Sequence, residues 1–564
     1  MKRCAVLVAL VGVLILVVVS VVAAQSTPQP VVRLGHWLEV GNEVFMHILG
    51  AADVRYRTVH NNDFAGKVRD RTSARDPGST ATHEGDFDGS YAELRFGAEF
   101  RYQKNLSMHL LFEHQAVFDG SLIDDRANTS NPGGTDVFGR AAATENPAFH
   151  IERYWIDYQF AGTPLRLRVG ADLWIQDQAG LVGDDDPRLA LFVEQGPFGA
   201  MAAAVLQNES QRLGLVNDND FIYYTFSGWY DFKPHKVQLD VTYFRDRFSG
   251  ADTQTVGLRS GLGFTGQKND SVLIMASWSG TLGPVRALLQ GNLVTGTSRG
   301  GTTGRPLGVA AARQYDIFAG GVVAYAEADF GLVRPFVGVV YGSGDGDPTD
   351  NQLHGFATLP QREIALITGT PLFAHLETSN AFATRDYACP ARLQGMTGNS
   401  TIAHQGAAVL GSGGGIAGTE CAHSTGNPLN DRIGNTSHLG LATTYSNPGT
   451  ILIPVGLRVL PAKGHELAGW FVYRGLAKTD LLNSAFAPQL LAQGRRSIHR
   501  SQYYEVGGLY QWTLNPHFDI RISGNIAIPG EGYKDIGRLA TCGSTSCSGG
   551  DLALVGEARF RARF

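Results

Sequence analysis

The chain has 564 residues, of which 70 are glycine and 18% are charged, and its formal net charge is −5. Glycine usually makes up about 7% of a protein, so it is over-represented here. No long apolar run follows the N-terminal region, which excludes a helical membrane protein. The negative charge gives no support for a nucleic-acid partner, because such partners usually require a basic patch.

Residues 1–24 have the order of a secretory signal peptide: the basic start "MKR", an apolar stretch, and small residues at the end. We expect cleavage after Ala24 and a short periplasmic segment at 25–42. The alternative is a permanent membrane anchor, since the apolar stretch is just long enough to span a bilayer.

Alternating apolar and charged residues recur along the remaining chain, as in "SYAELRFGAEFRY" (90–102), "LRLRVGADLW" (165–174) and the closing "DLALVGEARFRARF". Successive side chains of a strand point to opposite faces, so each run predicts a strand with one apolar and one charged face. Several runs reach ten residues. About 9–11 tilted residues are what a strand needs to cross a bilayer.

The connections between these runs alternate between short turns and long polar loops, as outer-membrane barrels require. We therefore predict an all-β fold, a transmembrane antiparallel β-barrel at 43–564 with about 18 strands, 16–18 allowing for the ambiguous stretch 254–268. The long loops are expected outside the cell and the short turns in the periplasm. The predicted strands start near residues 43, 88, 106, 149, 165, 188, 199, 220, 236, 271, 285, 313, 332, 450, 465, 501, 517 and 551.

The charged faces of these strands predict a pore lining with mixed charge, because the apolar faces must meet lipid. The basic pairs on the strands near 88 and 165 are the best candidates for ion selectivity. The alternative is that these side chains only pair across strands and keep the wall rigid. The candidates are Arg95, Arg101, Arg166, Arg168, Arg559, Arg561, Glu93, Glu99 and Asp172.

The segment 344–449 is far longer than an ordinary connection and is expected to be functional or disordered. We expect it to fold over or into the mouth of the barrel and to narrow the pore; an external cap is the alternative. Four cysteines remain after the signal peptide, and an even count in an exported chain suggests disulfides. Spacing favours Cys389–Cys421 and Cys542–Cys547, although three pairings are possible.

No cofactor is expected. Acidic residues cluster at 183–187 and 344–350, and carboxylates can bind Ca²⁺, but neither run matches an EF-hand and solvated turns explain both better. No phosphate loop, nucleophile elbow or HExxH pair is present, so we do not expect an enzyme. A barrel enzyme whose site is built from distant residues would escape such a motif search.

The C-terminal strand ending in Phe564 resembles the terminal signature of Gram-negative outer-membrane proteins, which the barrel-assembly machinery reads. Two stretches, "GTPLRLRVGADLWIQDQAGLVGDDD" (162–186) and "YGSGDGDPTDNQLHGF" (341–356), are similar to the alginate-export group of porins. That resemblance implies an eighteen-stranded barrel that passes small or polymeric solutes through a charged lumen. Alginate-specific members have a strongly basic pore, whereas the inward faces here mix both charges.

The sequence thus favours a passive channel in the cell outer membrane for small hydrophilic solutes or ions. A dedicated exporter of an acidic polysaccharide is the main alternative, and a sheath around a periplasmic electron carrier is a third. Expected partners are outer-membrane lipid, the solutes and the assembly machinery. Association of three barrels is left open.

Overall fold

The computed structural model describes residues 37–41, 43–60, 87–117, 150–172, 174–179, 183–184, 187–208, 221–246, 268–299, 314–347, 350, 352–356, 449–480, 483, 487–539, 541–542, 545–546 and 552–563. Within these ranges, no helix is both long and apolar enough to cross a membrane. The predicted signal peptide and the ambiguous stretch 254–267 lie outside them.

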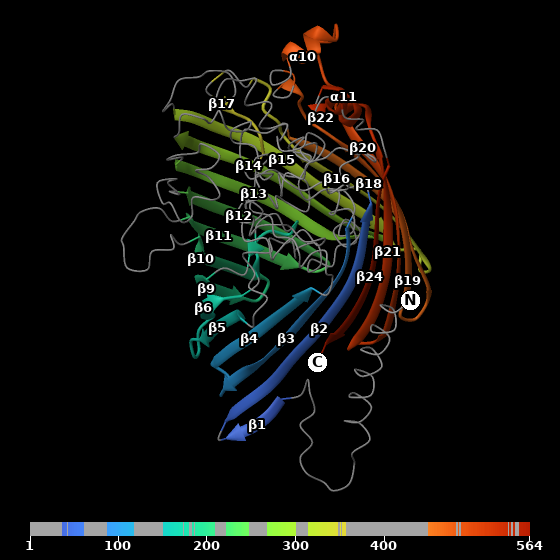
Figure 1. The fold of residues 1–564 in the computed structure, drawn as a ribbon. Helices are drawn as coiled ribbons and strands as arrows, with labels where there is room; N and C mark the ends of the chain where they lie inside the picture. Colours follow the sequence, from blue (N-terminus) through green and yellow to red (C-terminus); the bar gives the residue numbers. More distant parts are fainter. Residues whose placement is uncertain are drawn as a thin grey trace.

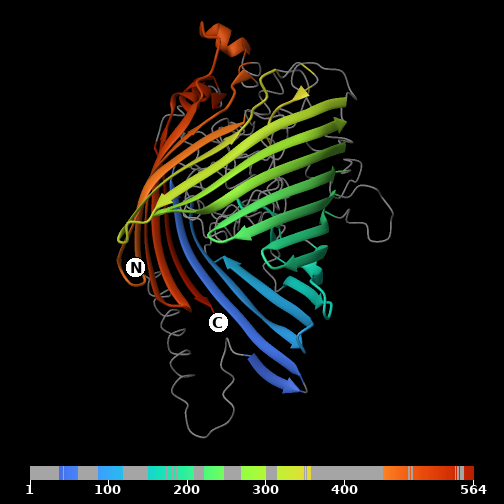
Figure 2. The ribbon, with the colours of Figure 1, turned by 180° about the vertical axis from the view of Figure 1, so that it is seen from behind.

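Eighteen long strands form the wall of a closed barrel, and each pairs antiparallel with its two neighbours (Figures 1 and 2). The first nine are β2 (Val44–His60), β3 (Phe87–Tyr102), β4 (Leu106–Val117), β5 (His150–Gln159), β6 (Leu165–Ala171), β9 (Pro187–Gln195), β10 (Phe198–Asn208), β11 (Phe221–Phe232) and β12 (His235–Asp246). The other nine are β13 (Lys268–Leu282), β14 (Val285–Arg299), β15 (Gln314–Ala328), β16 (Val333–Gly342), β18 (Thr450–Ala462), β19 (His465–Gly475), β20 (Ser501–Asn515), β21 (Phe518–Pro529) and β24 (Ala553–Arg563).

The described residues also form eight smaller elements besides the eighteen wall strands. Two short helices cap one end of the barrel, above the strands β18 to β24 (Figure 1). The small elements are β1 (Trp37–Gly41), β7 (Trp174–Ile175), β8 (Gly183–Asp184), β17 (Gln352–Leu353), α10 (Ala487–Ala492), α11 (Glu531–Leu539), β22 (Thr541–Cys542) and β23 (Thr545–Ser546).

The barrel has a short-turn end and a long-loop end, as the sequence predicted. The turns at the short-turn end are no longer than five residues, whereas every connection at the other end has at least twelve. Glycines at positive φ make several of these turns possible, for example Gly196 (φ 61°) and Gly283 (φ 59°). Both helices lie at the long-loop end (Figure 1).

The alternating sequence produces the two faces of the wall. On β3, Leu94 and Phe96 are about half exposed on the outer face, at 46% and 52%, whereas the intervening Arg95 points inward to the buried Glu113 of β4. The same alternation holds on β21, where Ile522 is exposed outward and Arg521 is buried. The outer surface of the barrel is therefore apolar and its polar groups face the interior.

The barrel closes between its first and last strands. Ten residues of β2, from Ala51 to His60, pair with β24. Beyond this seam β1 pairs with β2 from Val44 to His47, so β2 has a partner on that side at both of its ends. Sequence analysis assigned 37–41 to a segment outside the barrel; the structure adds it to the sheet.

A buried ion pair holds the closing seam. Arg559 of β24 stands in register with Arg521 of β21, and both side chains are buried, so two arginines of adjacent strands form a row of like charges. Asp53 accepts hydrogen bonds from both Nε and Nη2 of Arg559, and both residues are buried. Its carboxylate offsets the repulsion within this row of like charges.

We predict that Asp53→Ala lowers the free energy of unfolding by about 3–5 kcal/mol, because it removes the carboxylate that a buried guanidinium requires. The double variant Asp53→Leu with Arg559→Leu should be close to neutral, since it removes both charges. Urea titration followed by the gel mobility of the folded barrel measures both. Glu531→Ala, which breaks an exposed pair with Lys534, serves as the control and should cost less than about 1 kcal/mol. A loss of less than about 1 kcal/mol in the free energy of unfolding for Asp53→Ala would contradict this role of the pair.

Candidate solute pathway inside the barrel

The inner wall of the barrel has two unlike halves. On β10 to β16 buried apolar side chains on the inward face form a hydrophobic cluster, and buried polar residues such as Asp240, Gln290 and Asn292 lie among them. On β24 and β2 to β9 the inward side chains are largely charged. The apolar inward residues of the first half include Val205, Tyr223, Phe244, Leu273, Met275, Leu288, Val294, Ile317, Val323, Phe336 and Val340.

Three arginines and two aspartates, which we call the arginine cluster, form the centre of the charged half. Asp157 of β5 pairs with Arg166 and Arg168 of β6 at 2.8 and 2.7 Å. Asp172, just after β6, pairs with Arg168 and with Arg188 of β9, the latter at 3.4 Å. Strand register explains the arrangement, because Asp157 stands directly opposite Arg168 and therefore faces the same side.

Aromatic rings support the arginine cluster from neighbouring strands. The guanidinium of Arg168 lies 4.3 Å from the ring centroid of Trp155, and that of Arg166 lies 4.0 Å from Phe192. The imidazole of His109 stacks on Trp155 at 5.1 Å. Contacts of a guanidinium with an aromatic face hold its plane in one orientation. The cluster is therefore a rigid, nearly charge-balanced strip on the wall.

The structure places the other predicted site residues on the same inner face but not in the same cluster. Arg95 pairs with Glu113, and Arg561 pairs with Asp519 at 2.8 Å. Arg101 pairs with Glu99 at 3.0 Å and lies over the ring of Trp37 near the short-turn end. Arg559 belongs to the closing seam. Glu93 stands opposite Asp53 in register, and its side chain lies outside the described residues.

Several arginines of the charged half keep part of their side chain exposed. The side chains of Arg95, Arg166 and Arg168 keep 18%, 23% and 20% of their accessible surface. Val205 and Leu273 on the opposite half are fully buried. Arg286 of β14 and Arg334 of β16, near the short-turn end, are also partly exposed, at 54% and 27%, so the arginines of the charged half are part of the exposed charge inside the barrel and not all of it.

A short stretch between β6 and β9, residues 175–179, folds into the barrel and is fixed to the apolar half. We call it the inward segment. Gln290 of β14 accepts a hydrogen bond from the backbone N–H of Ala179 at 3.0 Å and donates one to Asp177 at 2.7 Å. Thr242 of β12 donates to the side chain of Gln176 at 2.8 Å.

Two further bonds complete this attachment. Gln238 of β12 donates to the backbone carbonyl of Gln176, and Gln178 donates to Ser277 of β13 at 2.9 Å. Five side-chain hydrogen bonds from three strands therefore hold the inward segment, and each satisfies a polar group in a largely buried setting. The inward segment occupies space in the bore and so narrows the pathway.

Sequence analysis expected the loop 344–449 to fold over or into the mouth and to narrow the pore, and this stays a prediction because most of the loop lies outside the described residues. The described start of that loop does not cross the bore but completes the wall. Its strand β17 pairs with β15 at Asp316 and Ile317, beyond the point where β16 ends, and Leu353 and Phe356 join the hydrophobic cluster. The rest of the loop, with Cys389 and Cys421, lies outside the described residues.

The remaining sequence candidates are only partly described. Cys542 lies in the small hairpin of β22 and β23, opposite Thr545, whereas Cys547 lies outside the described residues, so their pairing stays a prediction. The acidic stretch 183–187 is described at Gly183, Asp184 and Pro187. Among described residues, no three His, Cys, Asp or Glu side chains converge as metal ligands would.

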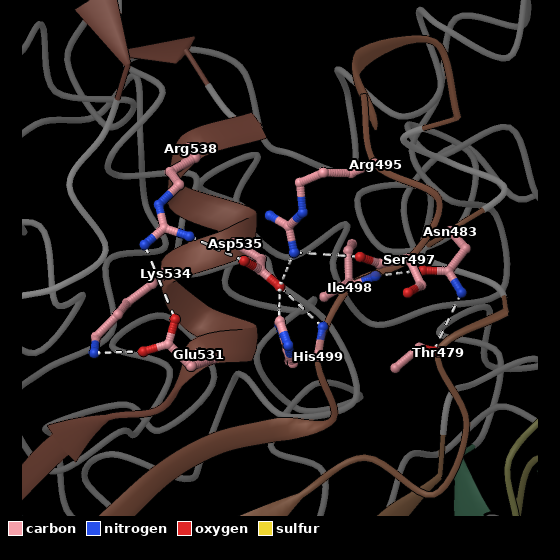
Figure 3. A network of polar contacts seen from close by, with 10 residues as sticks. All are labelled: Thr479, Asn483, Arg495, Ser497, Ile498, His499, Glu531, Lys534, Asp535 and Arg538. Carbon is pink, nitrogen blue, oxygen red and sulfur yellow. Dashed lines mark hydrogen bonds and ion pairs between the residues drawn. The ribbon is translucent and has the colours of Figure 1, made fainter. Parts of the chain in front are cut away.

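A polar clasp joins two loops at the long-loop end, where sequence analysis expected only loops (Figure 3). Asp535 of α11 is buried and pairs with Arg495 at 2.6 Å and with His499 at 2.7 Å, both from the loop before β20. Arg538 approaches the same carboxylate at 3.2 Å. Burial raises the pKa of Asp535, but bonds from Arg495 and His499 outweigh it and hold the pKa below its ordinary value.

Comparison with known proteins yields a likeness in shape alone. No protein-family model matches the sequence, and no curated protein matches it. Solved structures that it resembles include a BenF-like porin from Pseudomonas fluorescens, with 10% identity, a TM-score of 0.44, and coverage of 94% of this chain and 100% of that one.

The structures of two further Pseudomonas proteins resemble this chain to a similar degree. OccK11 (OpdR) from Pseudomonas aeruginosa has 8% identity and a TM-score of 0.43, covering 92% of this chain and 96% of that one. OprB from Pseudomonas putida has 9% identity and a TM-score of 0.40, covering 92% and 94%. Likeness at this level does not carry a function from those proteins to this chain.

We predict that Gln290→Ala with Gln238→Ala increases single-channel conductance, because the inward segment loses most of its bonds to the wall and can leave the bore. Recordings from the purified protein in a planar bilayer measure the change. Gln511→Ala, which removes a weak 3.4 Å bond to Thr513 on β20, is the matched control and should conduct like the parent. Equal conductance of all three proteins would show that the inward segment does not limit the pore.

We also predict a pH dependence of the clasp. A lowered pKa in the folded state means that the ionised Asp535 stabilises the clasp at neutral pH, and that this contribution disappears only as the pH falls below about 4. Pepsin should therefore cut the loop before β20 at pH 2.5 but not at pH 4.5. Asp535→Asn should be cut at both, whereas Glu531→Gln, on the exposed side of α11, should resemble the parent. Identical cleavage of all three would contradict the role of Asp535.

Proposed function

We propose that this protein is a porin of a Gram-negative outer membrane, which lets small hydrophilic solutes or ions diffuse through its lumen. One observation carries the proposal: a closed barrel with an apolar outer face and a partly exposed, charged strip on its inner wall. In hydrocarbon every backbone polar group needs a partner, and closure supplies it. The charged strip then provides a wet path through the membrane.

Aromatic residues on the outer face support the membrane placement. Tyr102, Phe198, Phe232 and Phe330 lie at or beside the short turns and are 42–65% exposed. Rings at that level fit the interface between acyl chains and headgroups. The predicted signal peptide at 1–24 supplies the route to the periplasm. The short-turn end would then be periplasmic and the long-loop end external.

The nature of the lining favours small solutes. Each arginine of the arginine cluster already pairs with a carboxylate, so the strip presents alternating charge and not a single strong sign. Mixed charges hydrate many small solutes without binding one tightly, which suits passive diffusion.

Export of an acidic polysaccharide is the second candidate, and the arginines on the water-exposed strip are the observation that favours it. A polyanion would have to compete with Asp157 and Asp172 for those arginines. A solute channel conducts steadily in a planar bilayer, whereas an exporter should be blocked by its own polymer.

We predict that Arg166→Glu with Arg168→Glu shifts the reversal potential in a KCl gradient toward cation preference. The pair changes the charge of the strip by four, and a ring of charge near the path sets ion selectivity. Lys233→Glu with Lys463→Glu, in exposed short turns, makes the same change of charge away from the strip and should leave the potential near that of the parent. No shift for the arginine pair would place the pathway elsewhere.

A further inference from the structure

The surface around the clasp carries basic side chains from two loops, of which Figure 3 shows Lys534 and Arg538 of α11 beside the buried Asp535. We call this surface the outer basic patch and define it as Arg496, Arg500, Lys534 and Arg538. Arg496 and Arg500 are exposed, and the side chain of Arg538 is 54% exposed. The whole chain carries a net charge of −5, so a basic surface here is a local feature.

The acidic groups that the structure describes near the outer basic patch neutralise it only in part. Asp535 is buried and is held chiefly by Arg495 and His499. Glu531 pairs with Lys534 at 2.8 Å and reaches Arg538 only at 3.9 Å. Arg538 also pairs with Asp535 at 3.2 Å, so both cations of α11 have a carboxylate partner, whereas within the described residues Arg496 and Arg500 form no ion pair.

An apolar strip of the outer wall leads directly to this patch. On β19 and β20, Phe471 and Val506 are 43% and 48% exposed, and Tyr504 packs between the rings of Phe471 and Tyr473. Arg500 interacts electrostatically with the hydroxyl of Tyr473, which places its charge at the top of that strip. On β21, Ile526 and Ile528 are each 43% exposed just below α11.

We propose that the outer basic patch and the apolar strip together bind an anionic, phosphate-bearing glycolipid of the outer leaflet. Its acyl chains would lie on Phe471, Val506 and Ile526, and its phosphates would contact the guanidinium and ammonium groups above. Arginine and lysine at this height suit phosphate, because both charges persist at neutral pH. The proposal rests on the outer-membrane placement argued above.

The continuity of the two surfaces is what favours a lipid over a soluble anion. A soluble anion would need the basic groups alone, whereas an amphiphile uses both the charges and the exposed apolar side chains that end beneath them. Because the clasp joins the two loops, the basic side chains of the patch are held near the long-loop end of the apolar strip. Such a site would anchor the external loops to the leaflet around them.

The test compares two matched triple variants of the full-length barrel in detergent, titrated with lipid A, a bisphosphorylated and acylated disaccharide. Arg500→Gln, Lys534→Gln and Arg538→Gln remove the patch, and Lys104→Gln, Lys233→Gln and Lys463→Gln remove three cations from exposed short turns. Native mass spectrometry counts the bound lipid. The patch variant should bind about tenfold or more weakly, and the turn variant within twofold of the parent.

Two results would overturn the proposal. One is equal lipid binding by the parent and the patch variant. The other is that glucose 6-phosphate displaces bound lipid A as effectively as added lipid A does, and that the patch variant also shows a changed reversal potential. Together these results would make the patch a filter for soluble anions. Folding of each variant is checked by its gel mobility. Because lipid binding is measured without a membrane potential, a barrel that bound the lipid but did not conduct would refute the channel function alone.

Discussion

Backbone hydrogen bonding in a medium without water is the constraint on which this structure depends. A strand within hydrocarbon cannot leave an edge open, so the last strand must meet the first, and β24 does so along ten residues of β2. Closure in turn brings like charges together, because Arg559 of the last strand stands opposite Arg521 of β21 and both are buried. Asp53 supplies the carboxylate that pairs with the buried Arg559. Closing the barrel therefore also requires a balance of charge on its inner face.

The interior itself is asymmetric, and the asymmetry defines the path. On β10 to β16 a cluster of buried apolar side chains lies on the inner face, and the inward segment is bound beside it through glutamine and threonine side chains. The opposite wall keeps its arginines partly exposed, each fixed by a carboxylate and some by an aromatic ring. Such a bore offers polar solutes a rigid lining of balanced charge, which is the physical basis of the proposed passive transport.

Much of the wall could be predicted from the sequence, because the alternation of apolar and polar residues with a period of two marks most of its strands. The eighteen predicted starts fall within three residues of the observed ones, and the alternation of short turns with long loops is confirmed. The inward position of Arg166 and Arg168 followed from the same rule.

The inward segment was missed, since "WIQDQAG" (174–180) carries no periodic pattern and is fixed by partners about 60 to 110 residues away. The apolar inner wall was missed because strands such as β13 are apolar on both faces. The clasp also depends on contacts between distant loops.

Liposome swelling tests the central claim most directly, because it requires an open aqueous path and nothing else. Vesicles containing the purified protein should swell in uncharged sugars at rates that fall as the sugar grows from a pentose to a trisaccharide. Heat-unfolded protein should give no swelling. Vesicles that contain the folded barrel and yet remain impermeable to every sugar would contradict the account.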